Sequence, residues 1–284
     1  MKILLTGASG QVGHELRRSL QGLGEVVALD RQQLDLAKLD QVRDVIRALR
    51  PGLIVNPAAY TAVDRAESES ALAFRINAEA PAVMAAEART LGAAMVHYST
   101  DYVFDGAKPG PYVETDSTNP INVYGASKLA GEQAIAQAGI AHLIFRTSWV
   151  YGMRGSNFLL TMLRLARERP QLRVVADQVG APTWSRTIAD STALVLAQAK
   201  LDSSWWERHS GVYHLSSQGS TAWHGFTEEI IARAGLACAV QPITSAEYPT
   251  SARRPANSLL DSSKLQQQFC RLPEWRAALA LCME

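Results

Sequence analysis

"KILLTGASGQVGHEL", residues 2–16, passes from a β-favouring run into a helical pattern through three glycines. Gly7, Gly10 and Gly13 stand three residues apart at the turn. Glycine allows a tight turn, a close approach of backbone to a pyrophosphate, and close packing of helix on strand. Free N–H groups and the dipole at the helix start attract anionic phosphates. A glycine triplet alone is weak evidence, but its place between strand and helix predicts a dinucleotide-binding loop.

The chain around this loop alternates between strand and helix patterns. Apolar runs are followed by helical spacing of apolar residues, and Pro51 ends one helix because a helix interior cannot hold proline. This rhythm predicts an α/β fold, a Rossmann-type doubly wound parallel sheet. The predicted strands after the first are residues 25–30, 52–59, 93–100 and 141–150. The predicted helices are residues 39–51 and 122–139, with one or two helices over residues 71–92.

The alternation becomes less regular after residue 150, which suggests a domain boundary. We predict an NAD(P)-binding Rossmann domain over residues 1–150, completed by returning elements at about 174–216. A smaller C-terminal substrate-binding domain would then take residues 151–173 and 217–284.

Charge and cysteine content narrow the class of protein. The formal net charge is +1, which gives no reason to expect a nucleic-acid or acidic-membrane partner. Cys238, Cys270 and Cys282 are far apart and lack CxxC spacing, which favours a reducing compartment over a disulfide frame or zinc site. No apolar run approaches the length of a signal-peptide core or a membrane span, so we expect a cytoplasmic protein.

The residue at the end of the second predicted strand is a candidate for distinguishing NADH from NADPH. Asp30 stands where an acid would accept hydrogen bonds from the adenosine ribose hydroxyls. The alternative is that Asp30 is only a turn residue. Asp30 suits NADH, whereas Arg31 beside it could accept a 2′-phosphate, so the sequence leaves NADPH or NADH open.

The stretch "YGASK", residues 124–128, holds the strongest candidates for chemistry. Residues four apart share a helix face, so Lys128 can lie beside Tyr124. An ammonium stabilises a phenolate and lowers the pKa of the phenol from about 10. Ser99 and Thr100 end the fourth strand, where hydroxyls of open α/β sheets can reach a substrate carbonyl. An ordinary surface helix without a catalytic role is the alternative. The glycine loop, the strand-end hydroxyls and the Tyr–Lys pair follow one another along the chain, and this order favours a catalytic site.

These marks resemble the extended short-chain dehydrogenase/reductases, with their GxxGxxG, strand-end Ser or Thr, and YxxxK. "HYSTDYVFDG", "FRTSWVYG" and "YPTSARRPANS" are similar to the members that reduce dTDP-linked 4-keto-6-deoxysugars. The resemblance implies reduction of the C4 keto group by NADPH or NADH to give dTDP-L-rhamnose. Tyr124 would donate the proton. Lys128 would lower its pKa and hold the nicotinamide ribose, and Thr100 would position the reacting oxygen.

The resemblance also assigns binding residues along the chain. Gly10, Gln11 and Val12 should line the pyrophosphate, and Asp30 the adenosine ribose. The remaining cofactor contacts implied are Asp35 and Leu36 near the adenine, and Ala59, Tyr60, Thr61 and Tyr98 along the cofactor. Those implied for the substrate, besides Thr100, are Asp101, Trp149, Arg253 and Arg254. The two arginines suit a diphosphate, although a solvated basic turn explains them as well.

One departure from the family bears on metal binding. Some members bind magnesium through glutamates at a dimer contact, but Arg186 stands where we expect one of them. Glu15 remains, and one carboxylate makes a poor magnesium site. We therefore expect no metal site, and either a monomer or a homodimer.

Two other functions stay open at this stage. Relatives of this family serve as non-catalytic regulatory subunits that bind NAD(P), although such a chain has little need of Thr100, Tyr124 and Lys128 together. A sugar-nucleotide epimerase or dehydratase of the same superfamily would hold NAD tightly without net turnover of added NADPH.

Overall fold

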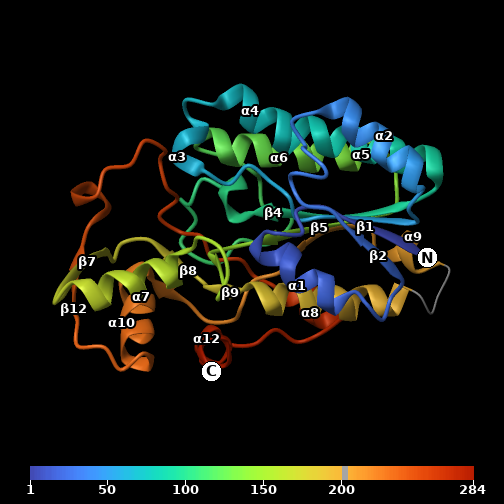
Figure 1. The fold of residues 1–284 in the computed structure, drawn as a ribbon. Coiled ribbons are helices and arrows are strands. Elements are labelled where there is room, and N and C mark those ends of the chain that lie inside the picture. Colours follow the sequence, from blue (N-terminus) through green and yellow to red (C-terminus); the bar gives the residue numbers. More distant parts are fainter. Residues whose placement is uncertain (200–203) are drawn as a thin grey trace.

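The computed structural model describes residues 1–199 and 204–284. Its centre is a six-stranded, all-parallel sheet in the order β10-β5-β4-β3-β1-β2, with helices above and below it (Figure 1). The strands are β1 (Lys2–Leu5), β2 (Glu25–Ala28), β3 (Leu53–Asn56), β4 (Ala94–Thr100), β5 (His142–Thr147) and β10 (Gly211–His214). The predicted fold class is confirmed.

Alternation along each strand sends side chains to two separate cores. Ile3 and Leu5 of β1 pack with Leu16 below the sheet, in the core that α1 and α8 cover. Leu4 packs on the other face with Ile46, in the core beneath α2, α5 and α6. Period-two alternation therefore fills both faces, as expected for a buried parallel sheet. These helices are α1 (Gln11–Ser19), α2 (Leu39–Leu49), α5 (Ala80–Leu91), α6 (Val123–Gln137) and α8 (Ser185–Ala199).

Helix ends follow local chemistry. α2 ends at Leu49, and Arg50 takes a left-handed conformation with φ of 47° before Pro51, so the predicted stop is confirmed. The predicted helical stretch 71–92 divides in the structure, and Gly92 ends its last helix with φ of 65°. The short segments there are α4 (Ser70–Phe74) and a π-helical turn (Arg75–Glu79). The separate short helix α3 (Val63–Ala66) precedes them, and a 3₁₀ turn (Asp101–Val103) follows β4.

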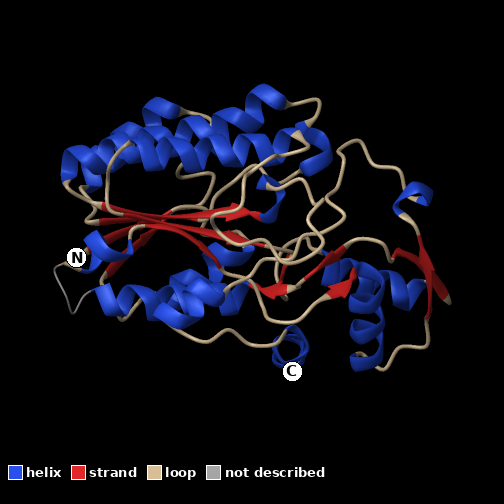
Figure 2. Cartoon of the chain, turned by 180° about the vertical axis from the view of Figure 1, so that it is seen from behind, coloured by secondary structure: helices blue, strands red, loops and turns tan. Residues whose placement is uncertain are grey.

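The remaining elements gather around a third core, to one side of the sheet in Figure 2. Tyr151, Phe226 and Trp275 are almost fully buried there. Three two-stranded sheets, β7–β12, β8–β11 and β6–β9, frame this part. Its elements are β6 (Val150–Tyr151), α7 (Phe158–Glu168), β7 (Gln171–Val175), β8 (Val179–Gly180), β9 (Thr183–Trp184), β11 (Thr221–Ala222), α10 (Trp223–Arg233), β12 (Ala239–Ile243), a 3₁₀ turn (Ser245–Glu247) and α12 (Trp275–Met283).

The chain returns to the central sheet later than expected. β7, β8 and β9 pair outside that sheet, so the returning segment begins with α8 at Ser185 instead of near residue 174. β10 then pairs with β5 at the sheet edge. Leu265 and Leu272 also join the core below the sheet, although they lie in the range 217–284 expected for the other domain. The division into two domains remains a prediction.

Two short helices complete the description, α9 (Trp205–His209) and α11 (Ser263–Gln268). The predicted returning segment includes residues 200–203, which lie outside the described residues. Within the described ranges no helix has the length and apolar character needed to cross a membrane.

The core below the sheet makes a stability prediction possible. Leu16 is fully buried on α1, whereas Leu194 on α8 is 55% exposed. Leu16→Ala should lower the free energy of unfolding by roughly 2–5 kcal/mol, because it removes buried methyl groups and leaves a cavity. Leu194→Ala is the matched control and should change it by less than about 0.5 kcal/mol. Urea unfolding measures both, and equal losses would contradict this packing.

Candidate active site

A cavity of about 570 Å³ opens where the carboxyl ends of β1, β3, β4 and β5 meet. Ligands of open α/β sheets bind at this edge. The structure brings together most of the predicted cofactor residues, which come from five separate segments of the chain. The cavity is lined by Gly7, Gly10, Gln11, Val12, Gly13, Arg31, Asp35, Leu36, Ala59, Tyr60, Thr61, Tyr98, Tyr124 and Lys128.

The glycine loop forms one wall of the cavity. Gly7 has φ of +58°, and its carbonyl accepts a hydrogen bond from the N–H of Gly10 at 2.9 Å. A Cβ on Gly13 would lie only 2.1 Å from the Gly7 carbonyl oxygen, so no larger residue fits the close contact of α1 with the loop. α1 then begins at Gln11 without a side-chain cap. Its first N–H groups face a cavity that suits a pyrophosphate.

Asp30 lies outside the described residues that line this cavity. Its Oδ1 accepts hydrogen bonds from the backbone N–H of Gln32 at 2.9 Å and of Gln33 at 3.2 Å. The carboxylate thus shapes the turn after β2, which was the alternative left open by the sequence. Arg31 lines the cavity with its side chain 77% exposed, 4.0 Å from Asp35. The contact of Asp30 with a ribose remains a prediction.

Tyr124 and Lys128 both line the cavity from the first turns of α6. Asn122 caps this helix, its Oδ1 accepting from the N–H of Gly125 at 2.8 Å. Gly125 is required there, since a Cβ would lie 2.1 Å from the carbonyl oxygen of Tyr102. Asn122 and Gly125 therefore place the start of α6, and with it the phenol, beside the end of β4.

The ionisation of this pair is set mainly by burial. Lys128 is 1% exposed, and burial lowers its pKa to about 8, while Glu132 acts in the opposite direction. Burial raises the pKa of Tyr124, and a hydrogen bond with Thr100 lowers it. Tyr124 is therefore protonated at neutral pH, as a proton donor must be. The lowering of its pKa by Lys128 remains a prediction.

Thr100 and Asp101 are buried, and neither is among the described residues that line the cavity. The Thr100 hydroxyl donates to Oδ1 of Asp101 at 3.0 Å and accepts from the N–H of Tyr102 at 3.1 Å. Burial raises the pKa of Asp101 to about 6, and hydrogen bonds from Ser258 and Thr100 lower it. Thr100 thus touches the catalytic candidate, whereas the contact of Asp101 with a substrate stays a prediction.

Trp149 also lies outside the described lining residues. It adopts φ of 49°, and its ring stacks on Trp223 with centroids 3.5 Å apart. Gly180 permits this packing, since a Cβ there would lie 2.4 Å from the indole. The structure therefore places Trp149 in an aromatic cluster, and its role toward substrate remains a prediction.

The two predicted diphosphate arginines differ in their surroundings. Arg254 donates to Oδ2 of Asp64 at 2.6 Å and is 20% exposed. The N–H of Ala252 donates to the other Asp64 oxygen at 3.0 Å. Arg253 is exposed, and its carbonyl accepts from the side chain of Asn122 at 2.8 Å. Both contacts bring the loop around residue 254 against the segments that carry Tyr60 and Tyr124.

The cavity also holds residues outside the predicted cofactor set. Ser99, whose hydroxyl was predicted to reach a substrate carbonyl, lies near the end of β4, and Thr147, which was not predicted, ends β5. Both hydroxyls are buried without a partner in the described part of the chain. Gly155 and Ser156 carried no sequence signal. Asn157 brings them in by donating to the side chain of Gln11 at 2.9 Å, across 146 residues. The other unpredicted lining residues are Ser9, Leu34, Pro57, Ala58, Ala62, Arg65, Ile76 and Val150.

The residues considered for magnesium do not form a cluster. Arg186 pairs with Asp190 on α8 at 3.6 Å. Among the described residues, no three His, Cys, Asp or Glu side chains are close enough to hold a metal ion. The expectation that the protein binds no metal remains a prediction.

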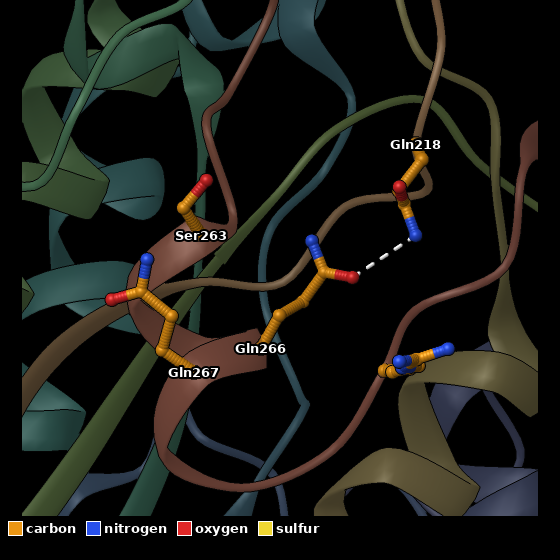
Figure 3. A pocket seen from close by; sticks show the side chains of 5 residues that line it. Gln218, Ser263, Gln266 and Gln267 are labelled. Atoms are coloured by element: carbon orange, nitrogen blue, oxygen red, sulfur yellow. Dashed lines mark hydrogen bonds between the residues drawn. The ribbon is translucent and has the colours of Figure 1, made fainter.

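A second cavity of about 330 Å³ offers no catalytic group (Figure 3). Its side chains are amides, a hydroxyl and the guanidinium of Arg271. Nε2 of Gln218 donates to Oε1 of Gln266 at 3.0 Å. The chemistry of the protein therefore belongs to the larger cavity.

Known proteins match the whole chain. A dTDP-4-dehydrorhamnose reductase of Burkholderia thailandensis is 52% identical, covering 100% of this chain and 98% of the relative. The crystal structure of a dTDP-4-dehydrorhamnose reductase from Clostridium acetobutylicum has a TM-score of 0.92 at 37% identity, covering 100% and 98%. The enzyme of that name from Bacillus anthracis, solved in complex with NADP, has a TM-score of 0.90 at 37% identity, covering 99% and 98%.

A parallel Rossmann-type sheet with a glycine loop and a Tyr–Lys pair on one cavity defines an extended short-chain dehydrogenase/reductase. Within this class, the chain belongs to the RmlD substrate binding domain family, which matches residues 1–284. The resemblance predicted from the sequence is confirmed.

The close contact in the glycine loop predicts a cofactor-binding defect. Gly13→Ala should weaken NADPH binding roughly tenfold or more, because the new Cβ must push the Gly7 carbonyl out of the pyrophosphate cradle. Gly22→Ala is the matched control, since nothing lies within 4 Å of a Cβ at that position. Fluorescence titration of NADPH measures both, and equal affinities would place the cofactor elsewhere.

Proposed function

We propose that this chain reduces the C4 keto group of dTDP-4-dehydro-L-rhamnose to dTDP-L-rhamnose, the last step of dTDP-rhamnose biosynthesis. The observation that carries the proposal is the meeting of Tyr124, Lys128 and the glycine loop at one cavity. The full-length similarity to dTDP-4-dehydrorhamnose reductases supports the choice of substrate.

The cavity fits a reduced nicotinamide dinucleotide. Gly13 leaves the space that a Cβ would fill, and the uncapped start of α1 provides N–H donors for the pyrophosphate. Leu36 offers an apolar surface for the adenine, and Arg31 can pair with a 2′-phosphate, so NADPH fits as well as NADH. When bound, the nicotinamide supplies the hydride that C4 receives.

The side chains of the protein complete the reduction. The protonated phenol of Tyr124 donates its proton to the C4 oxygen as negative charge develops there. Thr100 hydrogen-bonds Tyr124 and is itself held by Asp101, which orients the phenol. The positive charge of Lys128 then stabilises the phenolate that remains. Burial of these side chains keeps water away from the proton transfer and strengthens the electrostatic interactions between them.

The substrate is held from the loop around residue 254. Arg254 has a guanidinium fork suited to a diphosphate, and it already lies beside Asp64, next to the cofactor-side residue Arg65. Asp64 keeps the guanidinium in place before the diphosphate arrives. Arg253, Asp101 and Trp149 complete the predicted substrate set.

The proposal also covers the cellular compartment and the oligomeric state of the protein. We place the reaction in the cytoplasm, because Cys238, Cys270 and Cys282 are all free thiols. The functional unit is a monomer or a homodimer. The partner molecule is the dTDP-linked 4-keto-6-deoxysugar.

A coupled assay tests the reaction directly. Purified protein is mixed with NADPH, or with NADH, and with dTDP-4-dehydro-L-rhamnose formed in the same tube by an upstream epimerase. We expect loss of reduced-nicotinamide absorbance and formation of dTDP-L-rhamnose. Binding of NADPH without its consumption would favour a regulatory subunit. Cofactor retained through purification, without turnover of added NADPH, would favour an epimerase or dehydratase.

Tyr124→Phe is the sharpest variant for this assay. It removes only the phenolic proton donor, so kcat should fall by roughly 100-fold or more. The dissociation constant of NADPH should stay within about twofold of the wild type, because the ring and Lys128 remain. Unchanged turnover would assign the proton donor to another group.

Arg254→Ala tests the substrate contact. The KM for the sugar nucleotide should rise by roughly 10- to 100-fold, as expected for loss of a charge-assisted hydrogen bond, while NADPH affinity stays unchanged. Arg186→Ala is the control, since Arg186 also pairs with an aspartate but lies on α8 away from the cavity lining. A KM that rises equally in both variants would contradict a diphosphate contact.

A further inference from the structure

A continuous chain of buried polar side chains ends at Lys128. The hydroxyl of Thr6 lies 2.6 Å from Oδ1 of Asn56, and Nδ2 of Asn56 lies 3.1 Å from Nδ1 of His97. Nε2 of His97 then lies 3.1 Å from Nζ of Lys128. Each of these four side chains is at most 1% exposed. The chain runs from the residue after β1 through the end of β3 and the middle of β4 to α6.

The contacts of Lys128 leave one of its protons for the cavity. An ammonium group has three N–H donors. One donates to the carbonyl oxygen of Tyr98 at 2.6 Å, and a second is within reach of His97. The third remains for the cavity that Lys128 lines together with Tyr124. The carbonyl of Tyr98 and the ring of His97 therefore fix the position of Nζ.

We propose that His97, supported by Asn56 and Thr6, is a positioning residue for the reduction: its neutral ring holds Nζ of Lys128 beside Tyr124 and stabilises the ammonium form. This proposal rests on the proposed function. His97 lies outside the described cavity lining and acts only through Lys128.

A neutral imidazole has one N–H donor and one acceptor nitrogen, so the tautomer of His97 depends on whether Lys128 is charged. When charged Lys128 donates to Nε2, the ring proton is on Nδ1 and must find the amide oxygen of Asn56. When Lys128 is neutral, Nε2 carries the proton and donates to the amine, and Nδ1 accepts from the amide nitrogen. In the structure Nδ2 of Asn56 faces His97 and Oδ1 accepts from Thr6, which is the second arrangement; the first requires the amide to turn so that its two groups exchange places. The Thr6 hydroxyl, both donor and acceptor, serves either arrangement.

The surrounding charges favour a neutral His97. Burial, followed by the charge of Lys128, lowers the pKa of His97 well below its usual range. Glu132 on the same helix is the charged group that acts on Lys128, and it pairs with Arg146 on β5 at 2.7 Å. The two side chains that support His97, Thr6 and Asn56, are uncharged. A neutral ring is thus the acceptor that supports the ammonium without adding a second positive charge.

The first test is the pH profile of kcat/KM with the sugar nucleotide. Lys128 must be charged, so the wild-type profile should fall above its pKa of about 8. His97→Leu removes the acceptor, and the alkaline limb should move down by about one pH unit, the value of one hydrogen bond to a charged group. The kcat at pH 7 should fall roughly tenfold.

Two further variants distinguish a role of His97 in positioning Lys128 from a role in core packing alone. His97→Gln keeps an acceptor toward Lys128 and should restore most of the wild-type profile. His214→Leu is the matched control, since His214 is also fully buried but donates from Nδ1 to the carbonyl of Tyr112 at 3.0 Å. It should lower the melting temperature and leave the pH profile in place. A His97→Leu profile that superimposes on the wild type would overturn the proposal.

The second test needs no variant and no turnover. Nitrogen chemical shifts of labelled histidine in the wild-type protein report which ring nitrogen of His97 carries the proton. We expect the proton on Nδ1 below the Lys128 pKa of about 8 and on Nε2 above it. A tautomer that does not change across this range would refute the coupling even if the enzyme is active. Failure of the coupled assay alone would instead refute the proposed substrate.

Discussion

Burial of the central sheet on both faces is the constraint on which the rest of the structure depends. β3 and β4 are buried along their whole length, so a polar side chain in them costs free energy unless it finds a partner inside the protein. Asn56 and His97 do so by linking to Thr6 and Lys128. The need to satisfy buried polar groups therefore connects the middle of the sheet to the reacting end of α6.

The same sheet brings distant segments to one edge. Parallel strands direct their carboxyl ends, and the loops that follow, toward the same side. Side-chain contacts then close the cavity: Asn157 bonds Gln11, and Arg254 bonds Asp64. These contacts join the smaller part of the molecule to the cofactor side, so the loop that offers Arg254 lies against the segment that carries the cofactor-facing Arg65.

Local patterns predicted much of this. The strand and helix rhythm, the stop at Pro51 and the glycine loop were read correctly because short-range sterics and periodic burial decide them. The return to the central sheet was placed too early, near residue 174, because residues 172–177, "LRVVAD", have strand character whichever sheet they join. For Asp30, the sequence favoured a ribose contact over a turn; the structure shows hydrogen bonds within the turn, and the ribose contact stays a prediction.

The sequence by itself determined the fold class, the glycine loop and the spacing of Tyr124 and Lys128, because each follows from local patterns: the alternation of strands and helices, or residues a few positions apart. Only the tertiary structure decided what surrounds them. The partner of Arg254 lies 190 residues away in the chain, and the His97 contact with Lys128 spans 31. Trp149 stacks on Trp223 because Gly180 leaves room for its ring. Such contacts depend on how packed elements approach one another, which no local pattern encodes.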